Sequence, residues 1–136
     1  MGRLLAIDYG SKRTGIAVTD PLRIIATALD TITSDNVITF LKAYCSKEVV
    51  DEFVIGMPKN LKNEDSENAP RIREFIVVLK NAFPGKNVIE VDERFTSSIA
   101  KQTMHHAGLK KKSKRDKTMV DKISATLILQ NFLNSR

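Results

Sequence analysis

The chain has 136 residues and 42% hydrophobic content, which is enough for one globular domain with a buried core, so we expect a single domain over residues 1–136. No apolar stretch approaches the roughly 18 residues that cross a bilayer, which excludes a membrane-spanning helix. The N-terminus lacks the charged-then-apolar order of a signal peptide, and the one cysteine, Cys45, cannot form an internal disulfide. We therefore expect a cytoplasmic protein in which Cys45 is a small hydrophobic residue.

The formal net charge is +6, and most of it lies in residues 110–117, where six basic residues stand against one acid for a net charge of +5. A basic loop on an otherwise nearly neutral domain is typical of a protein that binds a polyanion, usually nucleic acid. The alternative is a solvated loop that only improves solubility. The candidates for nucleic-acid binding in this segment are Lys110, Lys111, Lys112, Lys114 and Arg115.

The first third of the chain predicts three antiparallel strands. Four apolar residues run into Asp8, a turn follows between Gly10 and Gly15, and further apolar runs cover residues 16–20 and 24–29. Glycines at both ends of the turn would let the chain reverse through positive φ at little cost. Ser34 or Asp35 can then cap a helix that carries apolar residues from position 37 to 44.

The rest of the chain predicts strands joined by helices. The expected elements are a buried strand at 53–56, a polar loop at 62–68, a helix at 72–83 with Pro70 in its first turn, a strand at 88–91, a helix at 96–106 and a last helix at 118–133. Right-handed crossovers place the last two strands parallel to the first and beside it. The fold class is therefore α/β, with a five-stranded mixed sheet of three antiparallel strands followed by two parallel strands, and helices on both faces.

Acidic residues stand where the parallel strands end. Asp8 closes the first strand, and Asp92 and Glu93 close the fifth, so the sheet would bring them to one edge, where open α/β sheets bind their ligands. Simpler explanations exist for each: Asp8 can accept backbone hydrogen bonds in its turn, and Asp92 or Glu93 can pair with Arg94.

Asp121 lies near the start of the last predicted helix, on one stripe with Ala125, Ile128 and Phe132. If that stripe packs on the sheet, Asp121 points inward and needs a cation, a donor or a metal as its partner. The alternative is a capping box, in which Thr118 and Asp121 cap their own helix.

Three acids from separate segments favour a metal site when they meet at one edge, because like charges otherwise raise one another's pKa. Hard divalent cations such as Mg²⁺ take oxygen ligands, and one or two of them can activate water and stabilise the leaving oxygen of a phosphodiester. The adjacent His105 and His106 have no Cys or acid at zinc-like spacing, and we interpret them as surface residues.

Four motifs in order resemble the YqgF/RuvX family, over essentially the whole chain. They are the stretch from Leu4 to Val18 with its Asp8-Tyr9-Gly10 turn, Gly56-Met57-Pro58-Lys59-Asn60, Asp92-Glu93-Arg94-Phe95-Thr96-Ser97, and Val120-Asp121-Lys122-Ile123-Ser124-Ala125 followed by Leu129-Gln130. Members are described as Holliday-junction resolvases and as nucleases that mature the small-subunit ribosomal RNA precursor. The resemblance implies an RNase H-like fold.

The family's acidic triad falls on Asp8, Glu93 and Asp121, with Asp92 as the alternative to Glu93. The resemblance implies a Mg²⁺- or Mn²⁺-dependent endonuclease that uses one or two ions, processing the 5′ end of pre-16S rRNA in ribosome biogenesis, resolving Holliday junctions in DNA recombination, or both. Its partners would be structured RNA or branched DNA, and the ribosome. A resolvase that cuts two strands symmetrically should be a homodimer, whereas an RNA-processing enzyme can be a monomer. Matching positions that would hold phosphates are Lys12, Arg13, Lys59, Asn60 and Arg94.

Other functions fit the sequence less well. The Asp8-Tyr9-Gly10-Ser11 turn also opens the actin-like ATPase fold, but that fold needs two such domains. A P-loop would require Lys where Ile16 stands. The remaining alternative is a non-catalytic module that binds nucleic acid or the ribosome.

Overall fold

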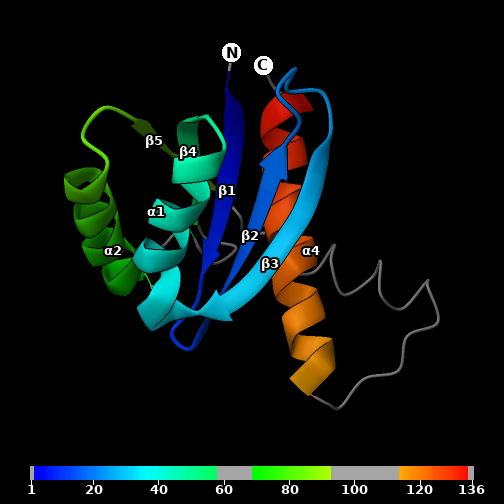
Figure 1. The fold of residues 1–136 in the computed structure, drawn as a ribbon. Coiled ribbons are helices and arrows are strands. Elements are labelled where there is room, and N and C mark those ends of the chain that lie inside the picture. The colour runs from blue at the N-terminus through cyan, green and yellow to red at the C-terminus, as the bar shows by residue number, and fades with distance from the viewer. Residues whose placement is uncertain (1, 58–68, 93–113, 135–136) are drawn as a thin grey trace.

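The computed structural model describes residues 2–57, 69–92 and 114–134, of which residues 92 and 114–122 are described by their backbone alone (Figure 1). In chain order the elements are β1 (Arg3–Tyr9), β2 (Arg13–Thr19), β3 (Ala26–Thr33), the 3₁₀ turn η1 (Ser34–Asn36), α1 (Val37–Lys47), β4 (Val50–Met57), α2 (Ala69–Ala82), β5 (Asn87–Asp92) and α4 (Lys114–Asn134). The predicted loop at 62–68 and the predicted helix at 96–106 lie outside the described residues.

The strands form one five-stranded sheet in the order β3-β2-β1-β4-β5. β1 pairs antiparallel with β2, and β2 antiparallel with β3, whereas β4 is parallel to both β1 and β5. This arrangement confirms the predicted mixed sheet, including the place of the two parallel strands beside the first. Both crossover strands enter the sheet through helical connections, as parallel pairing requires.

Helices cover both faces of the sheet, as predicted, with α1 and α2 on one face and α4 on the other (Figure 1). A hydrophobic core lies on each face of the sheet. Alternate residues of β1 pack in one core or the other, because successive side chains of a strand point to opposite faces. Leu5 and Ile7 pack in the cluster with α1 and α2, whereas Leu4 and Ala6 pack in the cluster with α4. All four side chains are fully buried, which explains why the strand reads as an unbroken apolar run.

The third strand starts two residues later than its apolar run suggests. Ile24 and Ile25 are each 61% exposed and lie in the loop before β3. The Asp20 carboxylate accepts hydrogen bonds from the backbone N–H groups of both, at 2.8 and 2.9 Å, while Arg23 adopts a positive φ of 59°. A local side-chain-to-backbone network therefore prevails over strand propensity here.

The last helix starts earlier than predicted. α4 begins at Lys114 rather than near residue 118, so residues 114–117 belong to its first turn and not to a loop. Lys and Arg are good helix formers, and the sequence contains no helix breaker between them and Thr118. The predicted helix at 72–83 corresponds to α2, which has Pro70 in its first turn as expected. None of the helices in the described ranges is long and apolar enough to cross a membrane.

Candidate functional site

The carboxyl ends of three parallel strands meet at one edge of the sheet. Ile7 of β1 pairs with Ile55 of β4, and Met57 of β4 pairs with Asp92 of β5. Asp8, which follows Ile7, and Asp92 therefore mark the ends of two strands that flank β4. This register confirms the expected gathering of strand ends, although only the backbone of Asp92 is described.

Asp8 belongs to the face of the sheet that α4 covers. Its side chain is half-buried, and its position two residues after Ala6 gives it the same face as Ala6, which packs in the cluster with Ala125 and Ile128. Across the antiparallel ladder Asp8 pairs with Gly15. Because paired residues share a face and glycine has no side chain, no side chain from Gly15 fills the space beside the Asp8 carboxylate.

Gly15 is a feature that the sequence interpretation missed. The turn was expected to extend from Gly10 to Gly15, but β2 begins at Arg13, so Gly15 is a buried strand residue. The tight connection between Tyr9 and Arg13 leaves only three residues outside the strands. Counting pairs outward from such a short turn would have placed Gly15 opposite Asp8.

α4 brings the segment of Asp121 to the same face. Ala125 and Ile128 are buried and Phe132 is partly buried against the cluster with Leu4, Ala6 and Val54, which confirms the predicted packing stripe. The capping-box alternative is wrong, because Thr118 lies inside the helix and is not its N-cap. Asp121 follows the helix start by about two turns and precedes Ala125 by four residues, but its side chain lies outside the described residues.

The direction of α4 places Asp121 toward the Asp8 end of the sheet. Near the other end of α4, the side-chain amide oxygen of Gln130 accepts a hydrogen bond of 3.2 Å from the N–H of Ala26, the first residue of β3. Ala26 pairs with Thr19, whose side-chain oxygen accepts from the N–H of Leu4 near the start of β1. Nine residues of helix span roughly 13 Å, so moving back from Gln130 to Asp121 advances toward the end of β1.

Hydrogen bonds from two buried hydroxyl groups, those of Ser34 and Thr14, hold the turn after Asp8 in place. The Ser34 hydroxyl donates to the Gly10 carbonyl, and it lies 2.9 Å from the hydroxyl of Thr14. Because Ser34 has one hydroxyl hydrogen, Thr14 must be the donor in the second bond. The N–H of Ser34 also donates to the Lys12 carbonyl over 3.0 Å, so two hydrogen bonds join η1 to the turn and a third joins it to Thr14 of β2.

These bonds correct the predicted role of Ser34. Neither η1 nor α1 has a side-chain hydrogen bond at its N-cap, so in this described part of the chain neither Ser34 nor Asp35 caps the helix. Gly10 is required by close approach and not by a positive φ, because a Cβ there would lie 2.3 Å from the Arg13 carbonyl oxygen. The turn thereby holds Lys12 exposed and Arg13 half-buried, immediately after Asp8.

Most of the other predicted site residues lie outside the part of the chain whose side chains the structure describes. Lys59, Asn60, Glu93, Arg94, Lys110, Lys111 and Lys112 lie outside the described residues, and Lys114 and Arg115 are described by their backbone in the first turn of α4. Among the side chains that the structure describes, no three His, Cys, Asp or Glu residues gather into a metal site. Of the predicted triad, Asp8 alone has a described side chain.

Comparison with known proteins gives a consistent result. The family model RuvX, described as a Holliday junction resolvase, matches residues 2–135. A protein of Bacteroides thetaiotaomicron named "Putative pre-16S rRNA nuclease" is 51% identical over 136 residues, covering 100% of this chain and 99% of its own length. A protein of Porphyromonas gingivalis with the same name is 50% identical over 135 residues, covering 99% and 98%.

Among solved structures, Thermus thermophilus RuvC in complex with a Holliday junction substrate matches with a TM-score of 0.55 and 11% identity, covering 99% of this chain and 96% of RuvC. At 11% identity this structural similarity is evidence for the fold alone, and it supports the RNase H-like fold. Sequence and fold together lead to one conclusion: the chain belongs to the RuvX family of nucleases.

Proposed function

We propose that this nuclease is a metal-dependent endonuclease whose catalytic, metal-binding carboxylates are Asp8, Glu93 and Asp121. The observation that carries the proposal is the place of Asp8, half-buried at the end of a central strand and on the face that α4 covers. The register of α4 supports the inclusion of Asp121, which precedes the buried Ala125 by one helical turn.

Strand spacing favours Glu93 over Asp92. Val91 packs in the α4-side cluster, together with Leu4 and Ala6. Residues two apart in a strand share a face, and Glu93 follows Val91 by two positions whereas Asp92 follows it by one. This spacing supports Glu93 as the third carboxylate.

The donor set fits a hard divalent cation. Carboxylate oxygens are the ligands that Mg²⁺ and Mn²⁺ prefer, and Asp8 offers them beside the empty side-chain position of Gly15. One or two bound ions would supply an activated water nucleophile and charge stabilisation for the leaving oxygen. The protein's own part would be to present the three carboxylates from β1, from α4 and from the position after β5, so that the ions and the scissile phosphate meet in one geometry.

Basic residues around the edge would position the nucleic-acid backbone. Lys12 is exposed on the hydrogen-bonded turn after Asp8. This position suits Lys12 to a phosphate contact near the cleavage site. We assign the same role to Arg13, Lys59, Asn60 and Arg94, and we assign sequence-independent affinity to the basic segment that includes Lys110, Lys111, Lys112, Lys114 and Arg115.

We propose the 5′ end of pre-16S rRNA as the first substrate, because the names of relatives about 50% identical over the whole chain refer to that precursor. The partner would then be the precursor rRNA, alone or on the ribosome, and a monomer would suffice. Holliday-junction cleavage in DNA recombination is the second candidate, favoured by the description of the RuvX family model, and it would call for a homodimer.

A cleavage assay with two labelled substrates tests the proposal. One substrate is an rRNA precursor with unprocessed ends and the other a four-way DNA junction, each incubated with Mg²⁺, Mn²⁺ or EDTA. We expect metal-dependent cleavage that Asp8→Asn lowers by at least about a hundredfold, since outer-shell partners of a metal alone are worth 10- to 100-fold. Asp51→Asn is the matched control, because it removes a carboxylate charge near the opposite end of the same sheet.

The outcomes separate the candidate functions. Cleavage of the RNA alone supports the processing role, and cleavage of the junction alone supports the resolvase role. Binding of both substrates without cleavage by the wild type would leave a non-catalytic nucleic-acid-binding module and refute the enzyme proposal.

A further inference from the structure

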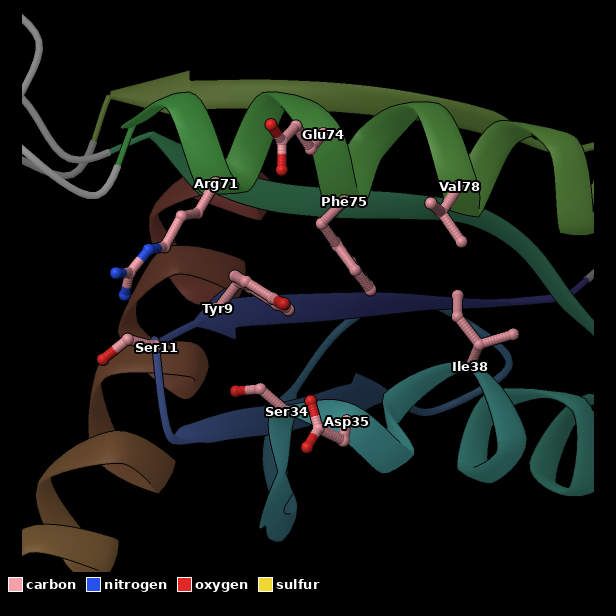
Figure 2. Close-up of a pocket in the computed structure, with 9 residues that line it drawn as sticks. All are labelled: Tyr9, Ser11, Ser34, Asp35, Ile38, Arg71, Glu74, Phe75 and Val78. Atoms are coloured by element: carbon pink, nitrogen blue, oxygen red, sulfur yellow. The ribbon is translucent and has the colours of Figure 1, made fainter.

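A groove opens on the side of β1 opposite Asp8. Tyr9 is the residue after Asp8, so its side chain points to the face of α1 and α2, where it packs against the core cluster of Ile7 and Phe53. Its ring stacks on that of Phe75 from α2, with centroids 4.4 Å apart and planes inclined by 21°. The two rings line a cavity of about 490 Å³ between η1, α1 and α2 (Figure 2).

The two ends of the groove differ in polarity. Figure 2 shows Arg71 and Ser11 at the end next to the β1–β2 turn, and Ile38 and Val78 at the other end. Asp35 from η1 and Glu74 from α2 line opposite walls near the Tyr9 ring. Arg71, Asp35 and Glu74 are all exposed, and no ion pair or hydrogen bond within the described part of the chain engages their charged groups.

This combination of groups matches a nucleotide. The flat Tyr9–Phe75 stack offers an aromatic surface to a base, and base–aromatic stacking is a main source of affinity for unpaired nucleotides. The two carboxylates can accept hydrogen bonds from exocyclic amino groups, and they make the walls unfavourable for a phosphate. Arg71 lies at the same end as Ser11 of the β1–β2 turn, the turn that also carries Lys12, and a phosphate of the same strand would pass there. The volume falls within the usual range for small-molecule sites, roughly 300–1,000 Å³.

We propose that this groove binds one unpaired nucleotide of the nucleic-acid substrate, close to the scissile phosphate, and prefers a base that carries an exocyclic amino group. The proposal rests on the proposed nuclease function, because Asp8 and Tyr9 are neighbours in β1. The base stacks on Tyr9, Asp35 and Glu74 accept hydrogen bonds from its amino group, and Arg71 binds the adjoining phosphate. The groove thus selects substrates with a bulged or frayed nucleotide, whereas the Asp8 edge cleaves them.

Binding in EDTA tests this groove independently of cleavage. Two fluorescein-labelled RNA hairpins with the same paired stem and the same all-uridine loop serve as probes, one with a single bulged adenosine in its stem and one without, and their affinities are measured by fluorescence anisotropy. We expect wild type to bind the bulged hairpin about tenfold more tightly, the effect typical of one stacked base. Equal affinities would overturn the proposal even if the cleavage assay succeeds, and a failed cleavage assay would leave this measurement unaffected.

A pair of tryptophan variants locates the binding to the groove. Val78 lines the groove and is 50% exposed, whereas its neighbour Val77 is 59% exposed and does not line it. Val78→Trp should fill the apolar end and abolish the preference for the bulge, while Val77→Trp should keep it. Retention of the preference by Val78→Trp, or its loss in Val77→Trp, would refute the groove as the site.

Base identity provides a second test that does not depend on a bulky substitution. Bulged adenosine, cytidine or guanosine should bind several-fold more tightly than bulged uridine, which has no amino group. The double variant Asp35→Asn/Glu74→Gln should reduce this discrimination, measured in each protein as the ratio of bulged to paired affinities so that the general gain in affinity from losing two negative charges cancels. Equal binding of all four bulges by the wild type would refute the proposed role of the two carboxylates.

Discussion

Thr14 and Ser34 share a hydrogen bond of 2.9 Å between their hydroxyl oxygens, beneath the turn that follows Asp8. Thr14 is fully buried and Ser34 is 8% exposed, so the Thr14 hydroxyl cannot turn to bulk water if its partner is removed. The Ser34 hydroxyl in turn donates a hydrogen bond to the Gly10 carbonyl. The turn is therefore fixed by a side chain that lies far later in the sequence, at the start of η1.

Ser34→Ala should weaken the fold through this network. The substitution leaves the buried Thr14 hydroxyl without its acceptor and the Gly10 carbonyl without this donor, and one buried unsatisfied group costs about 1–3 kcal/mol. Urea unfolding should show a lower midpoint at an unchanged slope. The control is Ser46→Ala on α1, whose exposed hydroxyl donates to the Ala43 carbonyl of its own helix. Equal stability of Ser34→Ala and wild type would show that the network carries no net energy.

Gly10→Ala should distort the turn because the new Cβ would lie 2.3 Å from the backbone oxygen of Arg13. We expect a loss of about 1–3 kcal/mol in unfolding free energy, and a larger fall in cleavage than in substrate binding, since the turn follows Asp8 directly. Gly85→Ala is the matched control, because a Cβ at Gly85 meets nothing within 4 Å. A Gly10→Ala protein with wild-type stability and activity would contradict this account of the turn.

Acid should destabilise the protein through Asp20 and Asp51. Backbone N–H groups of Ile25 and Ile24 hold the pKa of Asp20 below its ordinary 3.8, and the N–H of Gly2, followed by Arg23, does the same for the pKa of Asp51. Since both pKa values are lower in the folded state, their contribution is complete above about pH 4 and is lost as pH falls through the folded values. Unfolding free energies measured between pH 7 and pH 2.5 should therefore decline more steeply for wild type than for Asp20→Asn or Asp51→Asn.

In the same experiment, the three proteins should show parallel behaviour between pH 5 and pH 7, where these carboxylates are ionised in both states. Equal acid sensitivity of wild type and both variants would exclude Asp20 and Asp51 as the groups responsible.

Neutralising part of the basic segment should lower the salt dependence of binding. The triple variant Lys110→Gln/Lys111→Gln/Lys112→Gln should bind RNA more weakly, with the slope of log affinity against log salt reduced by about 0.7–0.9 for each phosphate that the variant no longer neutralises. The control is Lys42→Gln/Lys47→Gln/Lys80→Gln, which removes the same charge from exposed positions on α1 and α2. If both triple variants change the slope equally, the effect belongs to net charge and not to the segment.

The sheet could be predicted because its determinants are local and strong. The unbroken apolar run before Asp8 indicates a strand buried on both faces, and the spacing of Ile72, Phe75, Ile76 and Leu79 indicates a helix that packs on it. The order of these elements then leaves few topologies once right-handed crossovers are required. The meeting of strand ends at the Asp8 edge follows from that topology.

Features that depend on long-range contacts escaped prediction. Ser34 looks like a helix cap because its role depends on Thr14 and Gly10, which approach it only in the folded sheet. Ile24 and Ile25 look like strand residues because the pattern cannot show that the Asp20 carboxylate holds their N–H groups. The Tyr9–Phe75 stack likewise joins residues from β1 and α2, so neither segment alone contains a pattern that predicts the groove.

The alternation of Asp8 and Tyr9 at the end of β1 has an evolutionary consequence. Adjacent residues project to opposite faces, so the sheet itself acts as a partition between one surface beside α4 and another between α1 and α2. With the groove binding a nucleotide as proposed, substitutions around Tyr9 would alter which nucleotide is bound without disturbing the carboxylate on the far side. A lineage could thus diversify its targets while the chemistry stays constant, and an engineer could do the same by randomising the α2 wall alone.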